Sequence, residues 1–208
     1  MAEAKKERVK LITPLGRLTF PSIFNRAKPM QNEPQDKETK FEATIVFDVK
    51  YLKANPEELK RFNEIKKHAE GACVGLFKKS IKDCKIRIDK FNDPIRDGIQ
   101  KEHLAGYGEG TIFMKATSKR RPGVMQKVNG QSELILDPEA VYSGCYVRLN
   151  VTPYAYDNVG KGVAFALNSV MFVRDGERLD GTSNPEEDFG EIDGETVEVG
   201  SGDNDDLI

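Results

Sequence analysis

The sequence predicts a mainly β fold, arranged as a small, partly closed barrel, with one longer helix and a disordered acidic segment after it. Three observations lead to this prediction. Short segments rich in β-branched and aromatic residues alternate with turns rich in glycine and proline. A single stretch has the spacing and capping residues of a confident helix. The charges are divided unevenly between the body and the C-terminal part. A β-sandwich is the alternative architecture.

Strands are expected where apolar and polar residues alternate. The clearest case is the segment 40–48, in which Phe41, Ala43, Ile45 and Phe47 share one side. The same reasoning predicts one or two strands in 9–24 and further strands at 86–88, 111–118, 124–128, 133–136, 145–156 and 162–174. The loop 157–161 between the last two strands is typical of a β-hairpin.

The helix is predicted to begin at Pro56. Asn55 is a suitable cap, proline suits the first helical position, and Glu58 follows three residues after the cap. From there to Leu76, apolar residues recur every three or four positions, which indicates one buried stripe. Gly71 and Gly75 weaken the second half of this helix, because glycine is a poor helix former.

The net charge of −2 hides a strong separation of charge. Residues 175–208 contain thirteen acids and one base, a net of −12, whereas residues 1–174 contain 31 bases and 21 acids, a net of +10. A basic body attracts polyanions, and an acidic segment joined to it competes for the same surface. We therefore expect a folded domain at 1–174 and a disordered acidic tail at 175–208, because the tail has few large apolar residues to bury.

The sequence gives little support for catalysis. It has only two histidines, no CxxC or HExxH motif, no GxSxG motif and no Walker loop. We therefore predict no enzyme activity, no catalytic residues, no metal and no cofactor. A small nuclease is a minor alternative, because several acids of the body fall in expected loops: Asp83, Asp89, Asp93, Asp97, Glu102 and Glu109.

The sequence also bears on where the protein acts. No stretch approaches the roughly 20 apolar residues of a membrane helix. The first ten residues are charged and lack the apolar run of a secretory signal. Three cysteines, an odd and small number, fit buried apolar positions better than a disulfide framework. We expect a cytoplasmic protein that does not bind membranes.

Single-stranded nucleic acid is bound by a positive groove that follows the phosphates and by aromatic rings that stack on bases. In strand 111–118, Phe113 and Lys115 fall on one side. In strand 145–156, one side combines rings and cations. Side chains of these two strand faces and of the basic turn between 119 and 121 are the expected binding residues: Phe113, Lys115, Lys119, Arg120, Arg121, Tyr146, Arg148, Tyr154 and Tyr156.

Several segments, in this order and spacing, resemble the single-stranded DNA-binding proteins of tailed bacteriophages, in particular a phage family long catalogued as uncharacterised. They are Gly16-Arg-Leu-Thr-Phe-Pro-Ser-Ile-Phe24, Lys40-Phe-Glu-Ala-Thr-Ile-Val-Phe47, Pro94-Ile-Arg-Asp-Gly98, Gly106-Tyr-Gly-Glu-Gly-Thr-Ile-Phe-Met-Lys-Ala-Thr117, Tyr142-Ser-Gly-Cys-Tyr-Val147, Tyr154-Ala-Tyr-Asp157, Lys161-Gly-Val163 and Phe172-Val-Arg-Asp-Gly-Glu177. The resemblance implies an oligonucleotide/oligosaccharide-binding (OB) barrel. It adds Tyr107 and Lys161 to the expected DNA-binding residues.

The resemblance implies a sequence-nonspecific protein that coats single-stranded DNA in replication, recombination or repair, as a monomer or weak dimer. The acidic tail is similar to those of bacterial and T7-like phage single-strand binders, which recruit replication proteins. Asp203, Asp205, Asp206, Leu207 and Ile208 are the expected partner-binding residues, although related tails commonly end in phenylalanine. A non-enzymatic phage assembly protein is the alternative function.

Overall fold

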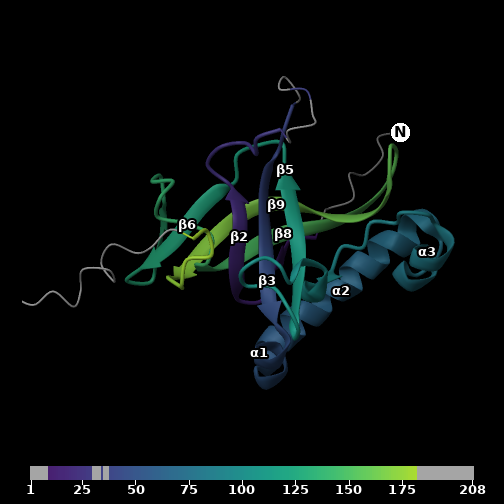
Figure 1. Ribbon diagram of the computed structural model, residues 1–208, viewed down its shortest axis with the longest axis horizontal. Coiled ribbons are helices and arrows are strands. Elements are labelled where there is room, and N and C mark those ends of the chain that lie inside the picture. The colour runs from purple at the N-terminus through teal and green to yellow at the C-terminus, as the bar shows by residue number, and fades with distance from the viewer. Residues whose placement is uncertain (1–8, 30–33, 35–37, 182–208) are drawn as a thin grey trace, which may run out of the picture.

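The computed structural model describes residues 9–29, 34 and 38–181 (Figure 1). Its centre is a strongly curved sheet with helices on one side. The described strands are β1 (Leu11–Ile12), β2 (Gly16–Ser22), β3 (Phe41–Asp48), β4 (Arg96–Asp97), β5 (Thr111–Ser118), β6 (Gly123–Val128), β7 (Gln131–Leu134), β8 (Tyr146–Asp157) and β9 (Lys161–Arg174). The mainly β prediction is confirmed. Each predicted strand overlaps a strand of the structure except the one predicted at 86–88.

Five of these strands form a ring. β2 pairs with β3, β3 with β5 and β8 with β9, all antiparallel. The ring is completed by two short pairings, parallel between β5 and β9 and antiparallel between β2 and β8, each through two residue pairs. A five-stranded, partly open barrel is the OB architecture. The hairpin of β6 and β7 extends the sheet from β9, and β1 extends it from β8.

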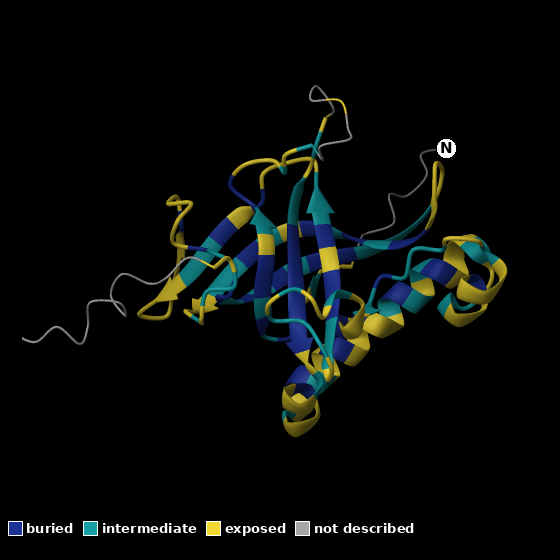
Figure 2. Cartoon of the chain, in the orientation of Figure 1, coloured by how far each residue is buried: buried dark blue, intermediate teal, exposed yellow. Residues whose placement is uncertain are grey.

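The core lies inside this ring. Alternate residues of the strands point inward, so Leu18, Ile45, Met114, Val147 and Phe165 are fully buried. Figure 2 shows the resulting alternation of buried and exposed positions along the strands. Burying each such side chain contributes about 1.5–3 kcal/mol, which makes the barrel interior the main source of stability.

The helices are α1 (Val49–Ala54), α2 (Pro56–Phe77) and α3 (Ile81–Arg87), followed by the short 3-10 helix η1 (Gly98–Lys101). The long helix begins at Pro56, as the sequence predicts. Its cap differs from the prediction. The Asn55 side chain makes no capping bond to α2 and instead donates to the Tyr51 carbonyl at 2.7 Å. Glu58 is turned toward the barrel, where its carboxylate accepts from the Leu15 backbone N–H at 2.9 Å.

The strand predicted at 86–88 is wrong, because this segment belongs to α3 and its end. Ser80 caps α3 by accepting from the Asp83 backbone N–H at 3.0 Å. Cys84 is buried against Cys73 of α2, with the two sulfurs 3.6 Å apart. The local alternation of apolar residues is overridden by this cap and by packing against α2.

The described chain continues past β9 along the surface of the barrel. The Tyr142 hydroxyl donates to the Asp175 carboxylate at 2.9 Å, and the Leu179 backbone N–H donates to the Ser143 carbonyl at 2.9 Å. Residues 175–179 thus contact the barrel, and the predicted division at residue 174 stays a prediction. The predicted disorder of the acidic tail concerns residues 182–208, which lie outside the described residues. Within the described part of the chain, every helix is too short or too polar to cross a membrane.

Candidate nucleic-acid interface

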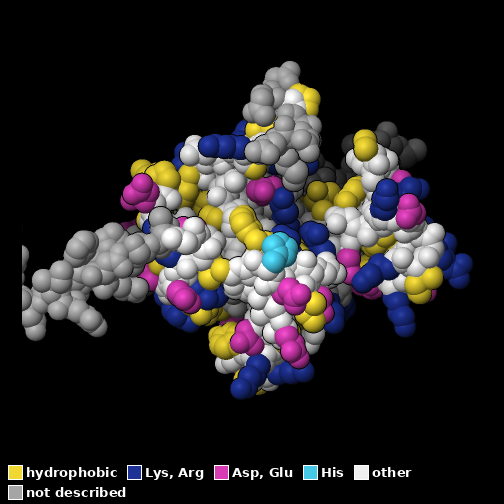
Figure 3. Space-filling view, in the orientation of Figure 1, with side chains coloured by type: hydrophobic (Ala, Val, Ile, Leu, Met, Phe, Trp, Pro, Cys, Tyr) yellow, Lys and Arg dark blue, Asp and Glu magenta, His cyan; other side chains and the backbone are white. Residues whose placement is uncertain are grey.

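The outer face of β2, β3 and β5 is formed by the alternate residues whose side chains point away from the barrel interior. The pairing register aligns on this face Arg17 and Thr19 of β2, Thr44 and Val46 of β3, and Phe113 and Lys115 of β5. The same face is turned toward the viewer in Figure 3, where Lys and Arg side chains gather near its centre. Thr19, Thr44, Val46 and Phe113 are buried here, whereas Lys115 is exposed. The fold therefore collects cations over a sheet face whose centre is covered by other side chains.

A cluster of rings and cations covers part of this surface, and we call it the aromatic–cation cluster: Phe20, Arg96, Lys101, Tyr107 and Phe113. The Lys101 ammonium lies 5.5 Å from the ring centre of Phe20, 5.4 Å from that of Tyr107 and 5.1 Å from that of Phe113. The Arg96 guanidinium carbon lies 5.1 Å from the Phe113 ring centre. Cations over ring faces are stabilised by the ring quadrupole, so the five side chains form one unit.

The backbone around the cluster places its rings at different depths. Phe20 has a φ of 49°, in the left-handed region that aromatic residues rarely adopt, and the residue is 51% exposed. Tyr107 is half-buried and its hydroxyl is 2.7 Å from the Thr19 hydroxyl. Phe113 lies beneath them with 1% exposure and meets Tyr107 edge to face, with ring centres 5.3 Å apart. Phe20 and Tyr107 are thus the accessible rings, and Phe113 supports them.

The electrostatics of the cluster favour an anion. Burial, followed by the repulsion of Arg96 and Lys115, lowers the pKa of Lys101. Glu42 compensates only in part, because its carboxylate is paired with Lys115 at 2.6 Å. The Arg96 Nε is buried and has no hydrogen-bond partner among the described residues. An anion that approached this cluster would relieve the repulsion between the cations.

A second ring lies further along the same face. Tyr146, at the start of β8, has the Arg174 guanidinium carbon 3.6 Å and that of Arg17 5.7 Å from its ring centre. A hollow of about 330 Å³ opens beside it, lined by these three residues and by Tyr51 and Val46. The hollow places one predicted DNA-binding tyrosine between two cations at the edge of the β2–β3–β5 face.

The remaining predicted residues of β8 do not share this surface. The Arg148 guanidinium donates to both carboxylate oxygens of Glu58, at 2.9 and 2.6 Å, and so joins β8 to α2. This pairing lowers the pKa of Glu58. Tyr154 and Tyr156 lie further along the β8–β9 hairpin, with ring centres 6.2 Å apart. The predicted common face is divided because α2 covers the middle of β8 and the register shifts after Asn150.

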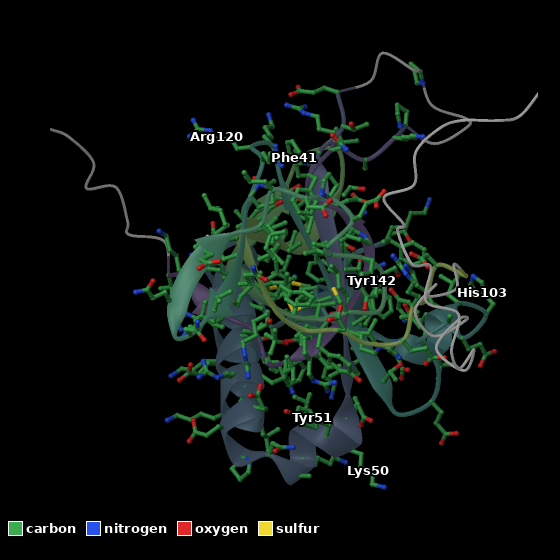
Figure 4. All side chains as sticks on the ribbon, turned by 90° about the vertical axis from the view of Figure 1, so that its left-hand side faces the viewer. Phe41, Lys50, Tyr51, His103, Arg120 and Tyr142 are labelled. Carbon is green, nitrogen blue, oxygen red and sulfur yellow. The ribbon has the colours of Figure 1, made fainter. Side chains whose placement is uncertain are left out.

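The basic turn is exposed at one end of the barrel. Figure 4 shows Arg120 there with Phe41, at the end opposite Tyr51. The Arg121 guanidinium carbon lies 5.4 Å from the Phe24 ring centre, and the Lys119 side chain is exposed. Lys161, another predicted residue, is paired with Asp157 at 3.2 Å in the hairpin loop. These cations are accessible but lie apart from the aromatic–cation cluster.

Sequence reasoning misses five residues of this surface: Arg17, Phe20, Arg96, Lys101 and Arg174. Four of them stand within the segments that resemble phage single-strand binders, so the resemblance itself contained the signal. Lys101 stands outside those segments and is brought in by η1. Strand alternation cannot find Phe20, since its ring direction depends on a local left-handed backbone.

The five predicted partner-binding residues of the tail lie outside the described residues. The acids considered for a nuclease site are scattered: within the described ranges, no three His, Cys, Asp or Glu side chains gather closely enough to hold a metal ion. The lining of the β2–β3–β5 face is dominated instead by cations and rings, which suit the binding of a charged polymer with stacking groups.

Solved structures of phage proteins share this fold. The single-stranded DNA-binding protein of bacteriophage Enc34 in complex with ssDNA superposes with a TM-score of 0.62 at 18% identity, over 85% of this chain and 96% of that one. The gp2.5 single-stranded DNA-binding protein of bacteriophage T7 superposes with a TM-score of 0.52 at 17% identity, over 94% of this chain and 100% of that one.

Sequence comparison gives the family. Protein p50 of Acyrthosiphon pisum secondary endosymbiont phage 1 is 42% identical over 87 residues, which make up 42% of this chain and 45% of that protein. The chain thus matches less than half the length of this curated relative. The family model described as Enterobacter phage Enc34, ssDNA-binding protein, matches residues 9–199. The chain belongs to this family of phage single-stranded DNA-binding proteins.

Proposed function

We propose that the protein coats single-stranded DNA without sequence preference and holds it on the outer face of β2, β3 and β5. The aromatic–cation cluster supports this proposal most strongly. Its cations suit phosphates, while Phe20 and Tyr107 can stack on bases, a contact that contributes about 1–3 kcal/mol per base. Tyr146 with Arg17 and Arg174 offers a second ring of the same kind.

Backbone and ring contacts of this kind carry no sequence code, because every base has a π-face and every nucleotide a phosphate. Of the predicted residues, Tyr107, Lys115 and Tyr146 belong to this surface, and Phe113 supports it from beneath. The exposed turn 119–121 would guide the strand at the barrel end. Arg148 has a structural role through Glu58, and Tyr154, Tyr156 and Lys161 would meet only a strand that continues along the hairpin.

The acidic tail competes with DNA for this face. The described chain ends next to this face. The Leu179 side chain lies so close to Gly106, the residue before Tyr107, that a Cβ atom at Gly106 would be 2.7 Å from it. Residues 182–208 carry ten acids and no base. A DNA strand that displaces them also frees Asp203, Asp205, Asp206, Leu207 and Ile208 to bind replication or recombination proteins. The protein acts by binding alone, as a monomer or weak dimer in the host cytoplasm, and protects exposed strands from nucleases and re-pairing.

Fluorescence anisotropy with a labelled oligothymidine tests both parts. We expect the affinity of the full chain to fall linearly with salt on logarithmic axes, because phosphate contacts release counterions. A full-length variant with Asn or Gln in place of the ten acids of 182–208 should bind more tightly at low salt. Failure of the full chain and of this variant to bind at low salt would contradict DNA coating. Equal affinities for the two would contradict competition by the tail.

A further inference from the structure

A groove of about 610 Å³ opens between α2, α3 and the β4–β5 edge of the barrel. Its floor and walls are apolar: Phe62, Ile81, Ile86, Ile95 and Ile112. Ile86 is 75% exposed although it belongs to a helix that packs against the body. An apolar groove rimmed by polar groups is the usual form of a peptide-docking site.

The rim of the groove carries three lysines and two acids, a net charge of +1. Asp93 is paired with Lys85, and the Glu70 carboxylate accepts from the Ile81 backbone N–H at 3.1 Å. Lys66 and Lys82 form no salt bridge with any described residue. The whole helical segment 49–87 has eleven bases and five acids, a net of +6. The groove therefore suits a peptide that combines apolar side chains with negative charge.

The chain itself contains such a peptide. The segment Asp203–Ile208 contains three acids, two of which directly precede Leu207 and Ile208. The described chain ends on one side of the barrel and α3 lies on the opposite side, with β2, β3 and β5 between them (Figure 1). Residues 182–208 can span roughly 90 Å when extended, against a radius of gyration of about 16 Å for a domain of this size.

We propose that this groove docks the segment Asp203–Ile208 of its own chain and so anchors the acidic tail across the DNA-binding face. The proposal rests on the competition between tail and DNA proposed above and gives it a second point of attachment. A tail tethered only at residue 181 would be held by weak, screened charge interactions. Fixing its far end raises the local concentration of the ten acids over the cations of the face.

Docking can be measured with a photo-crosslinker in the full-length protein. p-Benzoylphenylalanine is incorporated at position 86 or, as a matched control, at position 136, because Ile86 and Leu136 are both 75% exposed. After irradiation and digestion, mass spectrometry should find crosslinks from position 86 to residues 203–208, at least about fivefold above those from position 136. Equal yields from the two positions, or no crosslink to 203–208, would overturn the proposal.

A mixture of isotopically heavy and light chains separates docking within one chain from docking between two. Crosslinks within one isotope form support the proposal, and random joining of heavy and light peptides would overturn it. Substitution of Leu207 and Ile208 by serine should abolish the crosslink from position 86.

DNA affinity gives the functional readout. In the full chain, Ile86→Glu should repel the tail and tighten oligothymidine binding, by up to about tenfold if the tail is anchored nine-tenths of the time. Leu136→Glu should leave the affinity unchanged. If neutralising the tail acids tightens binding but Ile86→Glu has no effect, the tail competes without this anchor and only the groove proposal fails. If neutralising the acids has no effect, competition by the tail fails, whatever the crosslinks show.

Discussion

Lys101 is the side chain that connects the rings of the aromatic–cation cluster, since its ammonium faces three of them. Its lowered pKa shows that the charge is held at a cost, through burial and the repulsion of Arg96 and Lys115. A bound phosphate would offset part of this repulsion, because its negative charge attracts all three cations. Of the described cations of the face, Lys101 is therefore the one whose charge we expect to contribute most to DNA binding.

Replacing Lys101 by alanine should weaken oligothymidine binding by about fivefold or more and reduce the slope of log affinity against log salt by about 0.7, the value for one phosphate contact on a single strand. Anisotropy titrations at several salt concentrations measure both quantities. Lys67→Ala is the control, because Lys67 is exposed on α2 away from the face. An unchanged salt slope in folded Lys101→Ala would remove this lysine from the binding surface.

The ion pair between Glu58 and Arg148 acts on stability instead. Glu58 has a 12% exposed side chain and a pKa held below its ordinary value of 4.5 by Arg148. A lowered folded-state pKa gives stability that is present above the ordinary pKa and lost as pH falls through the folded value. Glu58→Gln should therefore reduce the free energy of unfolding by about 3 kcal/mol at neutral pH.

Urea unfolding at pH 7 and at successively lower pH measures this effect. The difference between the native protein and Glu58→Gln should shrink as the pH falls below about 4.5, the ordinary value for this group. Glu57→Gln is the neighbouring control, since Glu57 is exposed at the start of α2. A constant difference across the acid range would show that the ion pair is not the source of the stability.

At the scale of elements, two glycines show how differently the same residue can act. Gly75 lies in α2 with open space where a Cβ would stand. Gly106 has a φ of 83° and a Cβ there would lie 2.7 Å from the Leu179 side chain. Gly75 lowers the stability of the helix. Gly106 lets the loop that carries Tyr107 pack closely against Leu179.

Gly75→Ala should accordingly raise the free energy of unfolding by about 0.5–1 kcal/mol without affecting DNA affinity. Gly106→Ala should lower it by about 1–3 kcal/mol, because alanine is strained at positive φ. The same change should weaken DNA binding by displacing Tyr107. Thermal unfolding and anisotropy on both variants test this contrast. Normal DNA affinity in Gly106→Ala would separate the loop from the binding surface.

Strand alternation and one helix start are enough to predict most elements of this fold, because the barrel core follows the period of two. The prediction fails at α3, where a serine cap and a cysteine contact decide the local structure. It also fails to separate the residues of β8, which look equivalent in sequence. Only the tertiary structure shows that Arg148 is paired with Glu58 of α2 and that Tyr146 lies beside Arg174.

At the scale of the whole molecule, the protein is a basic barrel joined to an acidic segment. The charge count predicts that division from sequence alone, and the resemblance segments predict the family. The position of the binding surface could not be predicted, because it forms only where β2, β3, β5 and η1 meet. Its cations come from distant parts of the chain, so their proximity is a property of the barrel.

The most direct test of this surface is photo-crosslinking of the full-length protein to oligodeoxynucleotides that contain 5-bromodeoxyuridine, followed by mass spectrometry of the crosslinked peptides. We predict crosslinks at Phe20, Tyr107 and Tyr146, and their loss at high salt. Crosslinks confined to Tyr154, Tyr156 or the turn 119–121, with none on the outer face of β2, β3 and β5, would contradict the account.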